Sequence, residues 1–361
     1  NFLTLLMIVC ILFSQACADS RFSFPEVVRG NSRIVSGWEA EPGQIPYQLS
    51  LRMVNPAGNV NACGATIIHS EWGLTAAHCT ATRVSFVIRA GTVNLTRPGA
   101  IFETTKYYNH PLYNEAIPGV VQPHDIGLIE FGRALIFSDL IQPIRIQRSS
   151  DKDRNYDEIQ LTASGWGRTW TDASSPENMN WVYLRGTSNE ECLSWYGGSA
   201  IIQPSTICAR YYNVTSQSTC QGDSGGLLAV IDDDGVVSQI GVTSFVSATG
   251  CHTEFPAGFI RPGYYHEWFT QVSGHNFDWE YEAPATEEPA TTEAATTEAA
   301  TTEAATTEAA TTEAATTEAA TTEAATTEAA TTEAATTEAA TTEAATTEAA
   351  TTEAEETTED D

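Results

Sequence analysis

The chain has 361 residues, of which 47 are acidic and 17 are basic, so its formal net charge is −30 at pH 7. From His275 onward there are 23 acidic residues and no lysine or arginine, so the part before His275 is only mildly acidic. This charge excludes a nucleic acid as partner, because phosphates are bound through an excess of lysine and arginine.

An apolar run over residues 2–13 opens the chain, and Ala16-Cys17-Ala18 follows it just before polar Asp19. A short apolar run that ends in a small-residue site predicts a secretory signal peptide over residues 1–18, cut after Ala18. A membrane anchor is the competing interpretation, but the run is too short to span a bilayer comfortably. We therefore expect a secreted, extracellular protein with no membrane partner.

Residues 34–274 have a mostly strand-like pattern. Apolar and polar residues alternate over residues 83–89 and 159–163, and Asp232-Asp233-Asp234-Gly235 predicts a hairpin turn. Short strands with frequent turns predict a β-barrel or a β-sandwich. We expect only two helices, one over residues 188–196 that opens with a capping box, and one that closes the domain with an apolar stripe over residues 264–272.

Three six-residue motifs carry the residue types of nucleophilic catalysis. His78 ends an apolar stretch in LTAAHC, Asp125 enters an apolar strand in HDIGLI, and Ser224 lies among glycines in QGDSGG. Serine is a weak nucleophile, so an imidazole must take its proton and a buried carboxylate must hold that imidazole in the correct tautomer. Each residue alone is equally compatible with a structural role, as a core histidine, a strand-edge charge or a turn serine. Their joint occurrence favours catalysis.

The order histidine, aspartate, serine and these motifs resemble the chymotrypsin-like serine peptidases over residues 34–269. Residues 242–247 are most similar to arthropod (insect) chymotrypsins and the collagenolytic, brachyurin-like branch. The resemblance implies an all-β fold of two six-stranded antiparallel β-barrels with a short C-terminal helix. It also implies a monomeric peptidase domain over residues 34–274 that hydrolyses protein or peptide substrates without a cofactor.

The resemblance further implies activation by proteolysis. Residues 19–33 would be an activation propeptide, removed when an activating peptidase cuts after Arg33 and frees the amino group of Ile34. That ammonium would pair with buried Asp223 and bring the N–H groups of Gly222 and Ser224 into an oxyanion hole.

Of the eight cysteines, two fall in the signal peptide, and the remaining six predict a disulfide framework. Spacing alone permits 15 pairings, and the resemblance selects Cys63 with Cys79, Cys192 with Cys208, and Cys220 with Cys251. No C-x-x-C pair occurs, which disfavours zinc. We expect no metal site either from the other histidines, which are His69, His110, His124, His252, His266 and His275.

The resemblance also places the substrate pocket. Ser218 would form its base, Val246 and Ala257 would lie near its entrance and depth, and Ser244 would hydrogen-bond Asp125. Neutral Ser218 disfavours cleavage after lysine or arginine, so we expect a chymotrypsin-like or elastase-like preference for apolar residues.

Digestion is the expected role. The alternatives are a collagenolytic or tissue-remodelling peptidase of the same family, and a catalytically silent, matrix-binding homologue. The second alternative is disfavoured because no member of the triad is missing.

Two sequons, at Asn94 and Asn213, can carry N-glycans in a secreted chain. Beyond the domain, residues 275–361 form an acidic tail in which TTEAA occurs twelve times between residues 291 and 350. This composition lacks a helical stripe or a strand face, so we expect disorder and, given the threonines, O-glycosylation. A tether to a mucous or chitin matrix, charge-based solubility, and repeat expansion without function all remain open.

Overall fold

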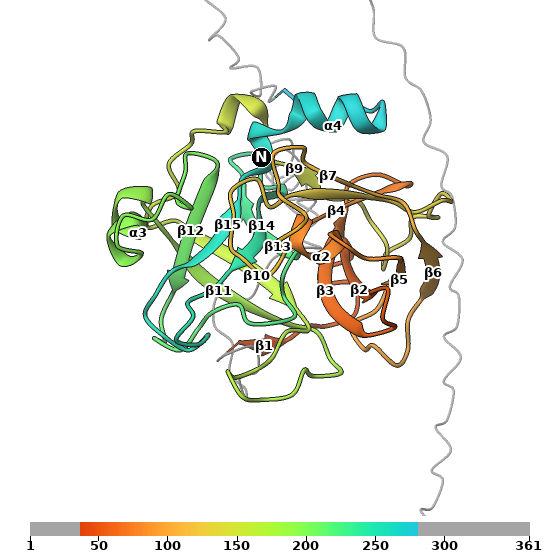
Figure 1. The fold of residues 1–361 in the computed structure, drawn as a ribbon, viewed down its shortest axis with the longest axis horizontal. Coiled ribbons are helices and arrows are strands. Elements are labelled where there is room, and N and C mark those ends of the chain that lie inside the picture. Colours follow the sequence, from red (N-terminus) through yellow and green to blue (C-terminus); the bar gives the residue numbers. More distant parts are fainter. Residues whose placement is uncertain (1–36, 281–361) are drawn as a thin grey trace, which may run out of the picture. The chain divides into compact units, whose positions relative to one another are not determined.

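The computed structural model describes residues 37–280, which form two curled antiparallel β-sheets, each wrapped around an apolar core (Figure 1). The signal peptide, the activation site at Arg33-Ile34 and the repeat tail lie outside the described residues. In the part that is described, no helix is long and apolar enough to cross a membrane.

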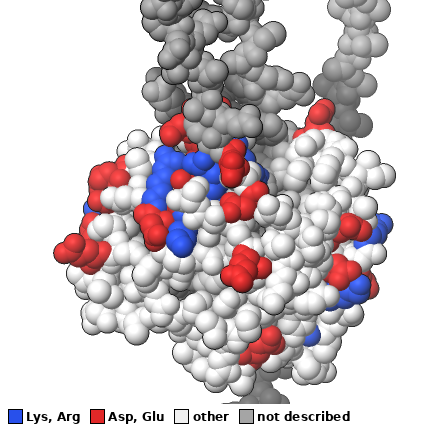
Figure 2. Space-filling model, turned by 90° about the horizontal axis from the view of Figure 1, so that it is seen from above, with Lys and Arg blue, Asp and Glu red and all other residues white. Residues whose placement is uncertain are grey.

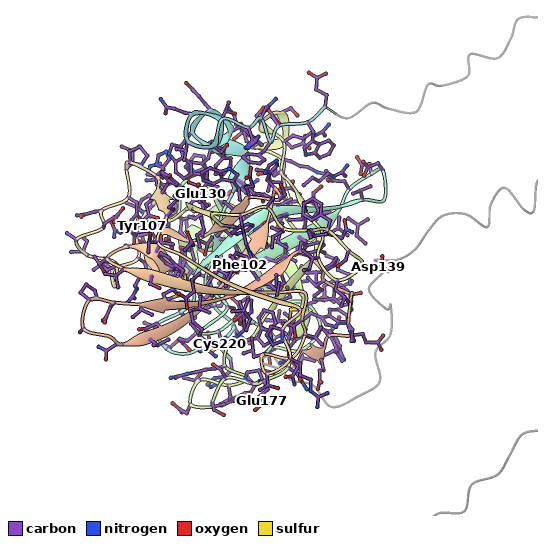
Figure 3. The ribbon with its side chains drawn as sticks, turned by 90° about the vertical axis from the view of Figure 1, so that its right-hand side faces the viewer. Phe102, Tyr107, Glu130, Asp139, Glu177 and Cys220 are labelled. Carbon is purple, nitrogen blue, oxygen red and sulfur yellow. A yellow bond between two sulfur atoms is a disulfide. The ribbon has the colours of Figure 1, made fainter. Side chains whose placement is uncertain are left out.

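The first sheet runs in the order β6-β5-β2-β3-β4-β8-β7. Its strands are β2 (Gln48–Val54), β3 (Val60–Ile67), β4 (Trp72–Thr75), β5 (Ser85–Ala90), β6 (Ala100–Thr104), β7 (Tyr107–Asn109) and β8 (Gly127–Glu130). Alternate side chains of these strands fill the interior. Phe102, labelled in Figure 3, packs there against Phe131, and their ring centroids are 5.2 Å apart. No ladder joins β6 to β7, but Thr104 at the end of β6 reaches β8 through a 2.7 Å hydrogen bond from Oγ1 to the carbonyl of Glu130.

The second sheet runs in the order β1-β11-β10-β13-β14-β15-β12, and β11 also pairs with β12, which closes six of its strands into a barrel. Its strands are β1 (Trp38–Glu39), β10 (Gln160–Gly165), β11 (Asn180–Thr187), β12 (Thr206–Tyr211), β13 (Leu227–Ile231), β14 (Val237–Phe245) and β15 (Ala257–Ile260). Short β9 (Arg145–Ile146) lies parallel to β14. The predicted all-β fold of two antiparallel barrels is confirmed, although the first barrel has an open ladder and an additional short strand, β7.

Three α-helices occur in the described residues, one more than expected: α2 (Ala77–Thr80), α3 (Asn189–Trp195) and α4 (His266–Ser273). Two 3₁₀ turns, η1 (Ser149–Asp151) and η2 (Pro262–Tyr264), precede β10 and α4 respectively. The predicted cap of α3 forms, because Ser188 Oγ accepts from the N–H of Glu191 at 3.1 Å. The reciprocal half of the capping box does not form, since the N–H of Ser188 donates to Asp157 and the carboxylate of Glu191 binds Arg210.

The disulfides pair as the resemblance implied, Cys63 with Cys79, Cys192 with Cys208, and Cys220 with Cys251. The first joins β3 to α2, and the second joins α3 to β12. Covalent links of this kind stabilise the fold mainly by restricting the unfolded chain.

Residues 275–280, which the acidic composition assigned to the tail, pack against the domain, and we call them the C-terminal strap. The indole N–H of Trp279 donates to the carbonyl of Ile146 at 2.8 Å, and the guanidinium of Arg145 lies 3.8 Å from the Trp279 ring. Phe277 packs against the core of the first barrel, and Asp278 accepts a 3.0 Å hydrogen bond from the N–H of Ser149.

The face that receives the strap carries a network of opposite charges. Arg145 also binds Asp232 and Asp234, and Arg154 binds Asp232 and Asp233. Figure 2 shows basic side chains gathered on one face and bordered by acidic ones. The strap therefore adds an aromatic ring to a network that is already paired.

The strap predicts a difference between two truncated chains. Removing residues 275–361 deletes Phe277 and Trp279, and the loss of two half-buried aromatic side chains should cost roughly 2–4 kcal/mol. The melting temperature should then fall by roughly 5–10 °C. Removing only residues 285–361 leaves the strap in place and should leave the melting temperature unchanged. Thermal unfolding followed by circular dichroism checks both chains, and equal melting temperatures would show that the strap does not stabilise the domain.

Candidate active site

Asp125 is buried just before β8, with 3% of its surface exposed. It follows His124, whose φ of 60° turns the chain sharply into the strand. Its carboxylate meets three donors: the backbone N–H of His78 at 2.8 Å, the Nδ1 of His78 at 2.7 Å, and the hydroxyl of Ser244 at 2.5 Å. The predicted contact of Ser244 with Asp125 is therefore present, and the burial of this charge is compensated by hydrogen bonds.

His78 lies in α2, a single helical turn that follows β4 directly. The neighbouring disulfide of Cys79 to Cys63 ties this turn to β3. Burial by itself would lower the pKa of His78, but the charge and hydrogen bond of Asp125 outweigh it, so the pKa of His78 is raised above 6.5. Because Nδ1 faces the carboxylate, Nε2 is the ring nitrogen left to accept a proton from elsewhere.

Ser224 lies on a tight turn between two glycines with positive φ, 103° at Gly222 and 77° at Gly225. Glycine adopts this region readily, whereas a Cβ at Gly225 would also stand 2.2 Å from Thr75 Oγ1. Two hydrogen bonds close the turn, from the N–H of Asp223 to the carbonyl of Cys220 and from the N–H of Gly226 to the carbonyl of Asp223. The N–H groups of Gly222 and Ser224 donate no hydrogen bond within residues 37–280, so both can serve a ligand.

A cleft of about 360 Å³ brings the three catalytic candidates together. His78 and Asp125 reach it from the first barrel, and Ser224, Ser244 and Val246 line it from the second. The candidate nucleophile, base and carboxylate thus line one solvent-accessible cleft.

A loop over residues 118–121 lines the same cleft and was not identified from the sequence. Val120 and Val121 are 56% and 43% exposed, which is high for apolar side chains. The only sign of this loop in the sequence is a pair of valines among turn-forming residues. Such a pair does not predict a cleft wall, because it has no characteristic spacing from the catalytic motifs. The loop adds an apolar wall beside His78.

Asp223 is 1% exposed and its carboxylate accepts from two backbone N–H groups, that of Gly167 at 2.7 Å and that of Cys220 at 2.9 Å. Gly165 and Gly167 make room for it, since a Cβ at either position would stand 2.1 to 2.4 Å from its nearest carboxylate oxygen. Burial raises the pKa of Asp223 to about 6, and the two backbone hydrogen bonds, which lower the pKa, offset this rise only in part. No basic side chain within residues 37–280 pairs with it.

The predicted pocket residues are placed in two different ways. Val246 lines the cleft, whereas Ser218 and Ala257 are buried, with 6% and 2% of their surfaces exposed. The ring of Phe245 lies over its cross-strand neighbour Gly258, where a Cβ would stand 2.0 Å from the ring. The Phe245 ring therefore lies against β15 and lines the cleft together with Val246.

Both sequons are described. Asn213 is exposed, whereas Asn94 is half-buried and its side-chain nitrogen donates to the Oδ1 of Asn178 at 2.6 Å. A glycan on Asn94 would replace one proton of that amide nitrogen, so glycosylation would compete with the hydrogen bond to Asn178. Modification at either site stays a prediction.

Comparison with known proteins assigns the class. Residues 34–269 match the family model described as Trypsin. A collagenase from Hypoderma lineatum is 33% identical over 267 residues, which is 73% of this chain and 97% of that protein. Trypsin 5G1 from Aedes aegypti is 30% identical and is aligned over 68% of this chain and 87% of its own length. Chymotrypsin-like elastase family member 3B from Macaca mulatta is 30% identical, over 67% of this chain and 94% of its own length.

A solved structure, of HL collagenase, matches the fold with a TM-score of 0.60 and 32% identity, over 67% of this chain and 99% of that chain. Fold and cleft together define a two-barrel hydrolase with a nucleophilic serine. The chain belongs to the trypsin family and is a serine endopeptidase.

The pKa of His78 predicts the acidic limb of the pH profile. Protonated His78 cannot accept the serine proton, so kcat/KM falls as the pH drops through this pKa. Because the pKa is raised, the midpoint should lie above 6.5. Asp125→Asn removes the charge that raises it, so the midpoint should move to lower pH while kcat falls roughly 10⁴-fold.

The measurement is kcat/KM on a small ester between pH 5 and pH 9. Asp139→Asn, at an exposed aspartate (Figure 3), is the matched control and should reproduce the wild-type profile. A wild-type midpoint below 6.5 would contradict the effect of Asp125 on His78.

Proposed function

We propose that this chain is a secreted serine endopeptidase, made as a zymogen, that hydrolyses peptide bonds after apolar residues through an acyl-enzyme. The observation that carries the proposal is the 2.7 Å contact between His78 Nδ1 and the Asp125 carboxylate, in a cleft that Ser224 shares. Three disulfides within residues 37–280 agree with secretion into an oxidising compartment.

In the proposed mechanism Ser224 Oγ attacks the scissile carbonyl while His78 Nε2 takes the hydroxyl proton. Asp125 keeps the remaining N–H on Nδ1 and stabilises the imidazolium that forms. The free N–H groups of Gly222 and Ser224 donate to the oxyanion. His78 then protonates the leaving amine, the acyl group stays on Ser224, and a water activated by His78 hydrolyses the ester.

Activation follows from the environment of Asp223. A carboxylate whose pKa is raised to about 6 by burial destabilises the fold progressively as the pH rises from 3.8 through 6, because its charged form is poorly solvated. A buried ammonium would remove this cost. We propose that cleavage after Arg33 supplies it as the amino group of Ile34, which pairs with Asp223 and holds the turn of Gly222 and Ser224 in its donating geometry.

The preference for apolar residues rests on the lining of the pocket. Ser218 is buried and uncharged, so no carboxylate attracts a lysine or arginine side chain from this position. Val246 and the exposed Val120 and Val121 present apolar surface to the cleft. We assign Ser218 to the base, Val246 to the entrance and Ala257 to the depth of the pocket, and digestion as the role.

Collagen is a second candidate substrate. It is favoured by the Hypoderma lineatum collagenase, which is 33% identical and is matched over 97% of its length. The proposed tether of the acidic tail to a mucous or chitin matrix rests on composition alone, because residues 281–361 lie outside the described part of the chain.

The activation step predicts the behaviour of Arg33→Gln. After treatment with a trypsin-like activator, the wild type should react with a serine-directed phosphonylating reagent, and Arg33→Gln should be secreted but remain unlabelled. Arg29→Gln, which removes another basic residue of the propeptide, should activate normally. Ser224→Ala should be cut by the activator but not labelled. Full labelling of Arg33→Gln would refute activation at this bond.

The pocket assignment predicts the effect of Ser218→Asp. An unpaired carboxylate at this buried position should lower kcat/KM for leucine-type substrates by roughly tenfold or more, because the charge opposes an apolar side chain. Cleavage profiling on a mixed peptide library compares this variant with Ser194→Asp, a substitution at an exposed serine of α3. An unchanged profile for Ser218→Asp would place the base of the pocket elsewhere. Wild-type cleavage mainly after arginine or lysine would refute the apolar preference itself.

A further inference from the structure

A second cluster of chemically active side chains lies where the C-terminal strap meets the first barrel. His69 and Glu71 come from the turn between β3 and β4, and His275 is the first residue of the strap. One candidate ligand atom from each residue lies within 4.8 Å of the other two. None of the three residues lines the catalytic cleft. Their spacing along the chain shows no sign of the cluster, since the strap joins the turn only in the fold.

The donor set is that of a transition-metal site. Two imidazole nitrogens and one carboxylate oxygen are ligands that Zn²⁺ accepts in tetrahedral geometry, with the fourth position left for water. The other group of this kind in residues 37–280 comprises Cys63, His78 and Cys79. Its two sulfurs are joined in a disulfide and are therefore not available as thiolates.

Both histidines are held by their backbones. The N–H of His69 donates to the carbonyl of Trp72 at 3.1 Å, within the tight turn that also carries Glu71. Gly274 ends α4 with a φ of 75°, and the N–H of His275 then donates to Ser273 Oγ at 3.0 Å. The backbone of each ligand is thus locally ordered, which lowers the cost of ordering the ligands around an ion.

The side chains themselves are only weakly engaged. The imidazoles of His69 and His275 stack with 4.1 Å between their centroids and 29° between their planes. Nδ1 of His69 accepts one long hydrogen bond, 3.3 Å from the N–H of Glu71, and the ring of His275 forms no hydrogen bond within the described residues. One nitrogen from each ring already lies within 4.8 Å of the other and of a Glu71 oxygen, so joint ligation requires only a change in the tilt of the stacked rings.

The electrostatics also favour a cation. Glu71 is exposed and, among residues 37–280, no lysine, arginine or histidine forms an ion pair with it. The ring of Phe277 stands edge-on to that of His69 and tilted to that of His275, with centroids 6.5 Å and 6.1 Å away. One side of the cluster is thus apolar and the other is open to solvent, which suits three protein ligands plus water.

We propose that His69, Glu71 and His275 form a binding site for a divalent transition metal of the zinc type, separate from the catalytic cleft. The bound ion links the start of the C-terminal strap to the β3–β4 turn. Metal binding then stabilises the attachment of the strap without taking part in peptide hydrolysis.

The test is calorimetric titration of the full-length chain with ZnCl₂. Wild type should bind one equivalent tightly, above any weak background from the acidic tail, which is the same in every variant. His275→Ala should lower the affinity at least tenfold, and Glu71→Gln at least threefold. His252→Ala, which removes a half-buried histidine stacked on Trp170, is the matched control and should bind as wild type does.

Two further measurements distinguish an ion at this site from an ion bound elsewhere on the chain. Saturating Zn²⁺ should raise the melting temperature of the wild type, reversibly with EDTA, and should not raise that of His275→Ala. His78→Ala should keep the tight equivalent, because the ion does not use the catalytic base. Unchanged affinity in both His275→Ala and Glu71→Gln would overturn the proposal, and so would loss of the tight equivalent in His78→Ala. If His275→Ala does not fold, Glu71→Gln decides, since its side chain is exposed. Labelling of Ser224 is independent of all these outcomes.

Discussion

The buried carboxylate of Asp125 is the interaction on which the rest of this structure depends. This carboxyl group is 3% exposed, and three donors from two other segments satisfy its oxygens. Two of those donors belong to His78 on the first barrel, and the third is Ser244 on the second. Both barrels therefore contribute donors to this one carboxyl group, and the same contacts would orient the imidazole for the proposed proton transfer.

A second buried carboxylate, Asp223, lies beside the nucleophile and is satisfied differently. It has two backbone donors and no basic partner in the described residues, so burial raises its pKa. A basic partner would instead lower the pKa of a buried aspartate. The contrast gives each carboxylate its own function in the proposed mechanism. In that mechanism Asp125 already has its hydrogen-bond partners within the folded domain and orients the base. Asp223 would be stabilised by the ammonium group that cleavage after Arg33 would supply.

The parts that could be predicted from the sequence are those with local motifs. The residues around His78, Asp125 and Ser224 are characteristic enough to indicate the family, and the resemblance then gave the disulfide pairing that spacing alone left open. The sequence does not predict the four-residue α2, because a single helical turn has no hydrophobic periodicity. Composition places the strap in the tail because Asp278 and Glu280 begin the acidic stretch, although Phe277 and Trp279 beside them are the residues that pack. The His69 and His275 pair depends on that packing and leaves no trace in the spacing of the histidines.

The two glycines beside Asp223 have a consequence for how this domain can change by mutation. A Cβ at Gly165 or Gly167 would stand 2.1 to 2.4 Å from an oxygen of this carboxylate, which is too close for a non-bonded contact. A larger residue at either position would expel the carboxylate, and a larger residue at 223 would collide with the same backbone. We therefore expect positions 165, 167 and 223 to change only together in related chains, because a substitution at one of them requires a compensating change at the others.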